Sequence, residues 1–114
     1  MSDCLFCKIV AGTIPCDRIH EDDDVLAFHD ISPQAPAHVL LIPKRHIAAL
    51  TEIQDGDAYL MGRLAIVARD LCRELGLDET GYRWVINCGN DGCQSVPHLH
   101  MHLLGGRQLG WPPG

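Results

Sequence analysis

The sequence predicts an α+β domain in which one long helix packs on a mainly antiparallel β-sheet. Two observations predict this class. A helical apolar periodicity runs through residues 57–75, and short apolar segments bounded by turn residues lie on both sides of it. At 114 residues the chain has the length of a single domain, placed at 1–114, and can bury a core without disulfides.

The long helix is predicted from an apolar stripe. Its members recur every three or four residues: Leu60, Leu64, Val67, Leu71 and Leu75. Asp55 or Asp57 is placed to cap its start, and Gly76 to end it. The stripe has more apolar surface than one small sheet covers, which agrees with a two-fold dimer.

Four strands are predicted from short apolar segments that end at turn residues. They cover residues 25–30, 38–43, 82–88 and 98–104. The acidic residues 21–24 form a turn before the first strand. Upstream, the segment CLFCKIVAG predicts a short helix with Leu5, Ile9 and Val10 on one face.

Composition and charge exclude some partners and favour a compartment. The net charge of −6 argues against nucleic acid but leaves room for a small phosphorylated ligand. The sequence has no apolar stretch of the roughly 20 residues that a membrane span needs, and MSDCLFCKIV does not resemble a secretory signal. We therefore expect a cytoplasmic protein whose six cysteines stay reduced.

Three of the seven histidines lie at every second position, as His98, His100 and His102. Side chains alternate along a strand, so these three share one face, about 6.6–6.8 Å apart. The intervening Leu99, Met101 and Leu103 take the other face, toward the long helix. Three interpretations are open: a polar solvent face, a metal site, or a catalytic site with a neutral imidazole nucleophile.

The segment HLHMHLL has the His-x-His-x-His-x-x pattern, with hydrophobic x, of the histidine triad family. The chain resembles the nucleotide-binding phosphoramidase branch of that family also in FCKI, AFHDISPQAPAHVLLIPKRHI and INCGNDGCQSVPHLHMHLLGGRQLGWPPG, so the resemblance covers nearly the whole sequence. It implies a twisted antiparallel sheet of about five strands with one long and one short N-terminal helix. It also implies a homodimer in which Trp111 reaches the partner's active site.

The resemblance further implies hydrolysis of purine nucleoside 5′-phosphoramidates through a covalent nucleotidyl-histidine, without a cofactor. His100 would attack phosphorus while its other ring N–H is held, for which we expect a backbone carbonyl on a neighbouring strand. His102 would donate to a phosphate oxygen, His38 would complete the polar cluster, and Ser95 would bind the leaving group or the phosphate. Taken alone, His38 is equally a half-buried histidine, and Ser95 an ordinary loop serine.

The same resemblance assigns the nucleoside contacts. Asp30 would accept hydrogen bonds from the ribose hydroxyls, as suits a carboxylate at the end of a strand. Ile31 would pack on the base, helped by Phe28 and Leu26. Taken alone, Asp30 is only a turn carboxylate. The preference between adenine and guanine is not readable from these mainly apolar contacts.

The phosphate would be bound by Asn87 and by the loop of Cys93, Gln94 and Ser95, which offers backbone N–H groups. Cys93 departs from the family, in which we expect glycine. If the position requires a positive φ, cysteine is strained there, and its thiol makes the loop sensitive to oxidation.

Cys4 and Cys7 have the spacing of half a zinc site. The sequence has no second such pair, so histidines must complete a tetrahedral site, and resemblance to zinc-bearing relatives points to His46 and His98. Zinc would then be structural and take no part in the reaction. The alternative is that the two cysteines are small apolar helix residues. A thioredoxin-like redox motif is disfavoured because no βαβ pattern accompanies the pair.

Two further functions stay open beside the phosphoramidase. One is hydrolysis of dinucleoside polyphosphates, as in a sister branch of the family; the tail GGRQLGWPPG favours the phosphoramidase branch. The other is a non-catalytic nucleotide- or zinc-binding interaction module. The complete histidine pattern argues against this module, because binding alone needs no nucleophile.

Overall fold

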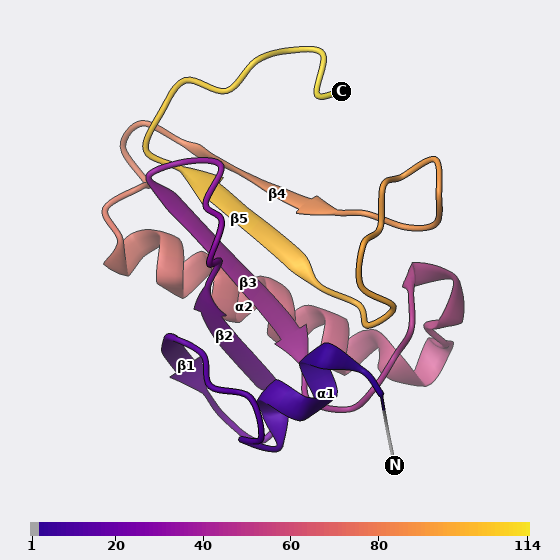
Figure 1. Cartoon of the computed structure of the whole chain (residues 1–114). Coiled ribbons are helices and arrows are strands. Elements are labelled where there is room, and N and C mark those ends of the chain that lie inside the picture. Colours follow the sequence, from indigo (N-terminus) through magenta and orange to yellow (C-terminus); the bar gives the residue numbers. More distant parts are fainter. Residues whose placement is uncertain (1–2) are drawn as a thin grey trace.

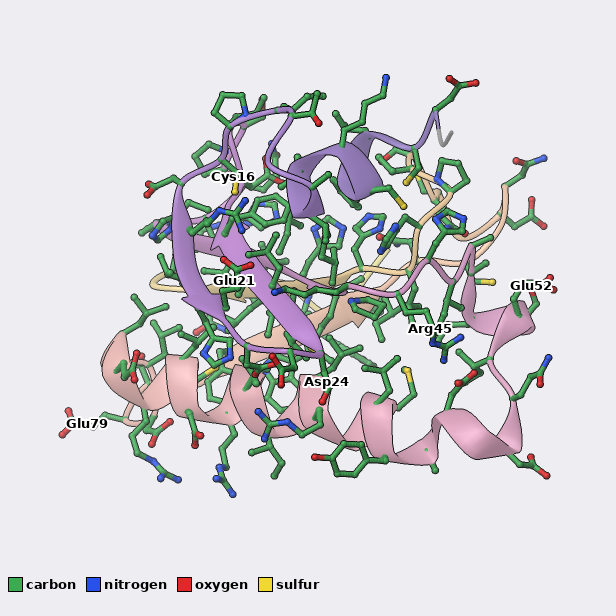
Figure 2. All side chains as sticks on the ribbon, turned by 90° about the horizontal axis from the view of Figure 1, so that it is seen from below. Cys16, Glu21, Asp24, Arg45, Glu52 and Glu79 are labelled. Carbon is green, nitrogen blue, oxygen red and sulfur yellow. The ribbon has the colours of Figure 1, made fainter. Side chains whose placement is uncertain are left out.

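A five-stranded antiparallel sheet lies between two helices of very different length, which confirms the predicted α+β class. The computed structural model describes residues 3–114, so the first two residues of the predicted domain lie outside the described part. Figure 2 shows the sheet between the short helix above and the long helix below. The helices are α1 (Leu5–Val10) and α2 (Ala58–Glu74), and the strands are β1 (Arg18–Glu21), β2 (Val25–His29), β3 (Ala37–Pro43), β4 (Tyr82–Ile86) and β5 (Met101–Gly105).

The histidine segment leads into β5, which has a neighbouring strand on each side. The strand order is β1-β2-β3-β5-β4, and every neighbouring pair is antiparallel (Figure 1). In the register of β3 with β5, Leu40 lies opposite His102 and His38 opposite Leu104. This pairing brings residues far apart in the sequence into one site.

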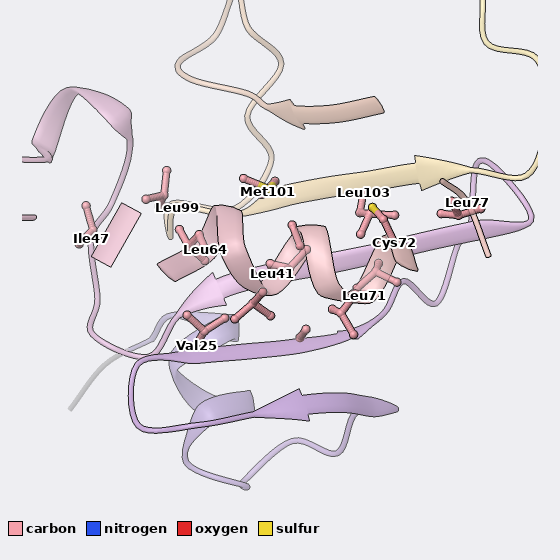
Figure 3. Close-up of a cluster of buried hydrophobic side chains, with 14 residues drawn as sticks. Val25, Leu41, Ile47, Leu64, Leu71, Cys72, Leu77, Leu99, Met101 and Leu103 are labelled. Atoms are coloured by element: carbon pink, nitrogen blue, oxygen red, sulfur yellow. The ribbon is translucent and has the colours of Figure 1, made fainter. Parts of the chain in front are cut away.

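The long helix covers one face of the sheet with the predicted stripe. Leu64, Val67 and Leu71 are buried, whereas Leu75 at the C-terminal end is 39 % exposed. Figure 3 shows this core between α2 and the strands. The sheet contributes Val25, Ala27, Val39, Leu41, Met101 and Leu103 to it. No helix within residues 3–114 is both long and apolar enough to cross a bilayer.

The short helix covers the opposite face with the predicted Ile9 and Val10, but with Phe6 in place of the predicted Leu5. Phe6 and Ile9 are buried, whereas Leu5 is 43 % exposed. Phe6 and Ile9 are three positions apart and therefore lie on one side of the helix. They pack on the sheet residues Leu26, Phe28, Leu40 and Ile42.

Two strand predictions need correction. β1 was not predicted, because RIHE is short and mostly polar, as edge strands often are. β5 begins at Met101 and not at residue 98. The reason is that β3 ends at Pro43, which has no N–H to donate, and Leu99 N–H donates instead to Ile47 O at 2.7 Å. Leu99 still belongs to the core between α2 and the sheet, so the side chains of residues 98–103 alternate as predicted.

Candidate functional site

The three histidines lie on the face of the sheet that α1 covers, and each has different neighbours. His98 is completely buried, His100 is 3 % exposed, and His102 is half-buried. Phe6 on α1 presents its ring edge-on to His98 and to His100, with ring centroids 5.8 Å and 5.1 Å apart. The short helix therefore closes over the histidine segment.

The hydrogen bonding of His100 fixes which nitrogen is available for chemistry. Its Nδ1 lies 2.8 Å from the carbonyl oxygen of His98. A carbonyl only accepts, so Nδ1 must carry the proton and Nε2 keeps its lone pair. The sequence predicted a carbonyl on a neighbouring strand; it comes instead from the same segment, two residues earlier.

A second hydrogen-bond chain fixes the proton on His102. The N–H of Gln34 donates to His38 Nδ1 at 3.0 Å, which leaves the His38 proton on Nε2. That Nε2 lies 2.9 Å from His102 Nδ1, so His38 donates and His102 accepts. The proton of neutral His102 must then reside on Nε2. Asp30 Oδ2 lies 3.4 Å from His38 Nε2, and Ser32 N–H donates to its other oxygen at 2.8 Å.

Burial keeps this pair of imidazoles neutral. Desolvation lowers the pKa of His102 to about 4, and the neighbouring His100 and His38 add to the effect. Desolvation also lowers the pKa of His38, although the Asp30 carboxylate opposes it. At neutral pH, His102 is therefore a neutral donor through Nε2.

A cavity of 260 Å³ opens beside these histidines. Six of the predicted site residues line it: Phe28, Asp30, Ile31, Ser95, His100 and His102. Ile31 is 97 % exposed, so its apolar surface is uncovered at the rim. This combination of apolar walls with a few polar groups is typical of a site for a small organic ligand.

The N-terminal segment contributes a wall of the cavity that the sequence does not predict. The lining also includes Leu5, Phe6, Ile9, Ile14, Pro15, Cys16, His29, Leu40 and Val96. Leu5 and Phe6 lie between Cys4 and Cys7, so a metal site formed by that pair beside His98 would bring both close to the histidine segment. The sequence does not indicate that Phe6 is the one that is buried.

Several predicted contacts lie outside the cavity lining. Leu26 is completely buried in the core beneath the site, so it cannot contact a base as predicted. Asn87, Cys93 and Gln94 do not line the cavity either. Gln94 instead ties the loop to a neighbouring segment: its Nε2 donates to Ala48 O at 2.8 Å.

The loop before the histidines contains a non-glycine residue in the left-handed conformation and a glycine without room for a side chain. Cys93 has φ 65°, the left-handed conformation for which the sequence analysis expected glycine. A Cβ at Gly92 would lie 2.3 Å from the carbonyl oxygen of Cys88, so only glycine fits there. Both positions give the loop its tight path between β4 and Ser95.

The four predicted metal ligands converge at the other end of the histidine segment. Their donor atoms are Cys4 Sγ, Cys7 Sγ, His46 Nδ1 and His98 Nδ1, all within 4.8 Å of one another. Cys7 Sγ lies 3.3 Å from His46 Nδ1, and the two ring nitrogens are 3.2 Å apart. Tetrahedral zinc with ordinary bond lengths separates its ligand atoms by about 3.3–3.8 Å. The donor set and its spacing therefore fit zinc.

The protonation of His98 also suits a metal ligand. Its Nε2 lies 2.8 Å from the carbonyl oxygen of Pro43, so Nε2 carries the proton and Nδ1 presents a lone pair to the sulfur atoms. On the cysteine side, the N–H of Cys7 donates to Cys4 Sγ at 3.4 Å. Asp30, His38 and His102 have donor atoms equally close to one another, but hydrogen bonds already occupy them.

Comparison with known proteins gives one consistent family. The HIT domain profile matches residues 11–109. The chain is 49 % identical to a 14 kDa zinc-binding protein of Brassica juncea, over 98 % of this chain and all of that protein. A HIT family hydrolase from Legionella pneumophila Philadelphia 1 superposes with a TM-score of 0.97 at 52 % identity, covering 98 % of this chain and 100 % of the other. A histidine triad nucleotide-binding protein from Candida albicans does so with a TM-score of 0.83 at 38 % identity, covering 96 % and 83 %. The chain therefore belongs to the HIT domain family.

Proposed function

We propose that the protein is a nucleotide-binding hydrolase that cleaves the P–N bond of purine nucleoside 5′-phosphoramidates. The single observation that carries this proposal is the hydrogen bond from His100 Nδ1–H to the His98 carbonyl. It leaves a neutral imidazole nitrogen with a free lone pair beside a cavity that has apolar walls and a carboxylate. That nitrogen is a competent nucleophile near pH 7.

The proposed reaction has two displacements at phosphorus. His100 Nε2 attacks the α-phosphorus, the P–N bond breaks, and the leaving amine takes one proton from a water molecule beside Ser95. The hydroxide left by that water then attacks the phosphorus, breaks the bond to Nε2 and releases the nucleoside monophosphate. One water molecule is consumed, and His100 returns to its starting state.

His102 and His38 stabilise charge on the phosphoryl oxygens in this scheme. The hydrogen-bond chain from Gln34 through His38 fixes the proton of neutral His102 on Nε2. This N–H can therefore donate to a phosphoryl oxygen without reorganisation of the site. Ser95 offers a further hydroxyl at the mouth of the cavity.

The nucleoside would occupy the remainder of the cavity. Asp30 accepts from the ribose hydroxyls, and Phe28 and Ile31 contact the base, since all three line the same space. The phosphate would lie toward Ser95. The N–H groups of Cys93 and Gln94 donate within the loop, to Asn90 O and Gly89 O at 3.0 Å each, so we propose the Ser95 N–H as the backbone donor to the phosphate. Asn87 does not line the cavity, so its contact with the phosphate stays a prediction.

The test is release of adenosine monophosphate from adenosine 5′-phosphoramidate by the native protein and by His100→Asn. We expect kcat to fall by about 10³-fold or more while adenosine monophosphate still binds. His20→Asn is the matched control, because His20 is a half-buried histidine bonded to Asp22 outside the cavity. Equal activity of the native protein and His100→Asn contradicts the proposed role.

The two alternative functions are outcomes of the same assay. Faster turnover of a dinucleoside polyphosphate than of the phosphoramidate assigns the protein to that reaction. Binding of adenosine monophosphate without turnover of either substrate favours the non-catalytic module.

Zinc is the metal that the Cys4, Cys7, His46 and His98 set would hold. Two thiolates and two imidazoles form a closed site with no position for substrate, so zinc would supply a cross-link and not chemistry. The site needs reduced thiols, which agrees with the cytoplasm as the proposed location.

We also propose the two-fold dimer. β4 is an edge strand, so one side of its backbone has no partner strand among the described residues. Tyr82 on β4 and Tyr59 on α2 are exposed, and Trp111 in the tail is 82 % exposed. Pairing of β4 with its copy would cover that edge, and sedimentation equilibrium at micromolar concentration measures the association.

A further inference from the structure

We propose that metal binding by the cluster of Cys4, Cys7, His46 and His98 raises the affinity of the cavity for a nucleoside monophosphate. The cluster fastens α1, which is a wall of that cavity, and it holds His98, whose carbonyl positions His100. His98 is thus a positioning residue. The inference rests on the proposed function, because it assigns a regulator to the same site.

The short helix cannot hold its own conformation. Helices below about 12 residues are marginal in water, and α1 has six. Two buried side chains, Phe6 and Ile9, attach it to the sheet, and Arg18 donates to Ile9 O at 3.0 Å. The two cysteines at its N-terminal end provide a further attachment, through His46 and His98.

This helix is also part of the ligand site. Leu5, Phe6 and Ile9 line the cavity together with His100 and His102. Phe6 contacts the imidazole of His100 edge-on. Movement of α1 away from the sheet therefore removes apolar surface that a bound base would cover and uncovers the side of His100.

His98 belongs to both sites at once. Its Nδ1 lies 3.4 Å from Cys4 Sγ and 3.5 Å from Cys7 Sγ, while its backbone carbonyl accepts a hydrogen bond from His100 Nδ1–H. The bond from Leu99 N–H to Ile47 O joins the His98 segment to the His46 segment as well. Loss of the metal leaves the two segments joined by hydrogen bonds alone, so the carbonyl that fixes the His100 tautomer is held less firmly.

Coupling of this kind is reciprocal. If zinc raises the affinity for the nucleotide by some factor, the nucleotide must raise the affinity for zinc by the same factor. A merely stabilising metal distant from the cavity would leave both affinities unchanged, provided the protein stays folded without it.

The experiment titrates adenosine monophosphate by calorimetry into the full-length protein, metal-free and zinc-loaded, under reducing conditions. We expect the zinc-loaded protein to bind about 10-fold more tightly or better, and zinc to bind more tightly by the same factor when the nucleotide is saturating. In Cys7→Ser the effect of zinc should be lost, whereas Cys88→Ser, a half-buried cysteine outside the cluster, should retain it.

Hydrogen exchange of the metal-free protein separates local release from unfolding. We expect amides of α1 to lose protection while those of α2 and β3 keep it. Equal nucleotide affinity in both metal states, or uniform loss of protection across the chain, overturns the inference and leaves the proposed function standing. Absence of nucleotide binding in both states overturns the two together.

Discussion

The two faces of the sheet are built on different physical principles. The face under α2 is a continuous apolar core, and 17 residues of helix cover it. The face under α1 contains the buried histidines, and a helix of six residues covers it. The division passes through one strand, in which Met101 and Leu103 face α2 while His102 faces the cavity.

The α2 face mainly stabilises the fold, whereas the α1 face contains the proposed catalytic groups. Burial of apolar side chains on the α2 face stabilises the fold directly. Their contribution to stability is therefore large and depends little on exact side-chain geometry. Polar side chains on the α1 face are buried only because each has a partner: His98 donates to Pro43 O, His100 to His98 O, and His38 accepts from Gln34. Mutations on the two faces should therefore change different quantities.

After the loss expected for His100→Asn, the largest expected effect is also on catalysis, from His102→Asn. Removing a neutral donor aimed at the developing charge should lower kcat by about 10²–10³-fold. The free energy of unfolding should change little, because the side chain is half-buried and the α2 core stays intact. Steady-state kinetics and urea unfolding measure the two quantities, and an unchanged kcat would show that His102 does not contact the reacting phosphoryl group.

The neighbouring substitution Leu103→Ala should do the reverse. Leu103 is completely buried in the α2 core, so truncation should lower the free energy of unfolding by about 2–5 kcal/mol. The kcat of the fraction that remains folded should stay close to the native value. Urea unfolding measures the stability, and activity corrected by active-site titration measures kcat. A large loss of kcat with unchanged stability would contradict the assignment of Leu103 to the stabilising face.

Low pH should lower the free energy of unfolding through the histidines on the α1 face. Desolvation lowers the pKa of His102 to about 4 in the folded protein, whereas the unfolded chain titrates near 6.5. The unfolded state therefore binds more protons between these values, and the free energy of unfolding falls as pH drops from about 6.5 toward about 4. Burial lowers the pKa of His38 as well, and Asp30 opposes it there.

Urea midpoints at several pH values measure this slope. We expect His102→Asn to reduce the slope relative to the native protein, whereas His20→Asn, outside the cavity, serves as the matched substitution. Equal slopes in the native protein and His102→Asn would mean that His102 titrates in the folded state as it does in the unfolded chain.

The smallest effect, on the free energy of unfolding, is expected from a substitution in the loop before the histidines. Cys93 has φ 65°, which costs a residue with a Cβ about 1 kcal/mol, and glycine adopts this conformation without strain. Cys93→Gly should therefore stabilise the protein by up to about 1 kcal/mol, less the entropy that glycine adds to the unfolded chain. Cys88→Gly has no positive φ to relieve and should not stabilise. A lower urea midpoint for Cys93→Gly would contradict the strain.

Much of the α2 face could be predicted from the sequence, because periodicity reports apolar burial directly. The helix stripe of Leu64, Val67 and Leu71 and the alternation of residues 98–103 are confirmed. The edge strand Arg18–Glu21 was missed because it is short and mostly polar, although the predicted turn at residues 21–24 begins at its end.

The α1 face was harder to predict, because backbone atoms determine much of it. The resemblance named residues whose donor atoms the structure brings together, such as Cys4, Cys7, His46 and His98. The sequence carries no signal for the Gln34 N–H or the Pro43 carbonyl that set the histidine tautomers. Phe6 was assigned to no site, because periodicity over a six-residue helix does not determine its buried side.

The central claim is that His100 forms a covalent bond to phosphorus. The most direct measurement is the stereochemical course of hydrolysis of an adenosine 5′-phosphoramidate made chiral at phosphorus with oxygen isotopes or sulfur. Two in-line displacements, first by His100 and then by water, invert the configuration twice, so we predict net retention. Net inversion would mean that water attacks phosphorus directly, and that the fixed tautomer of His100 serves binding instead of nucleophilic catalysis.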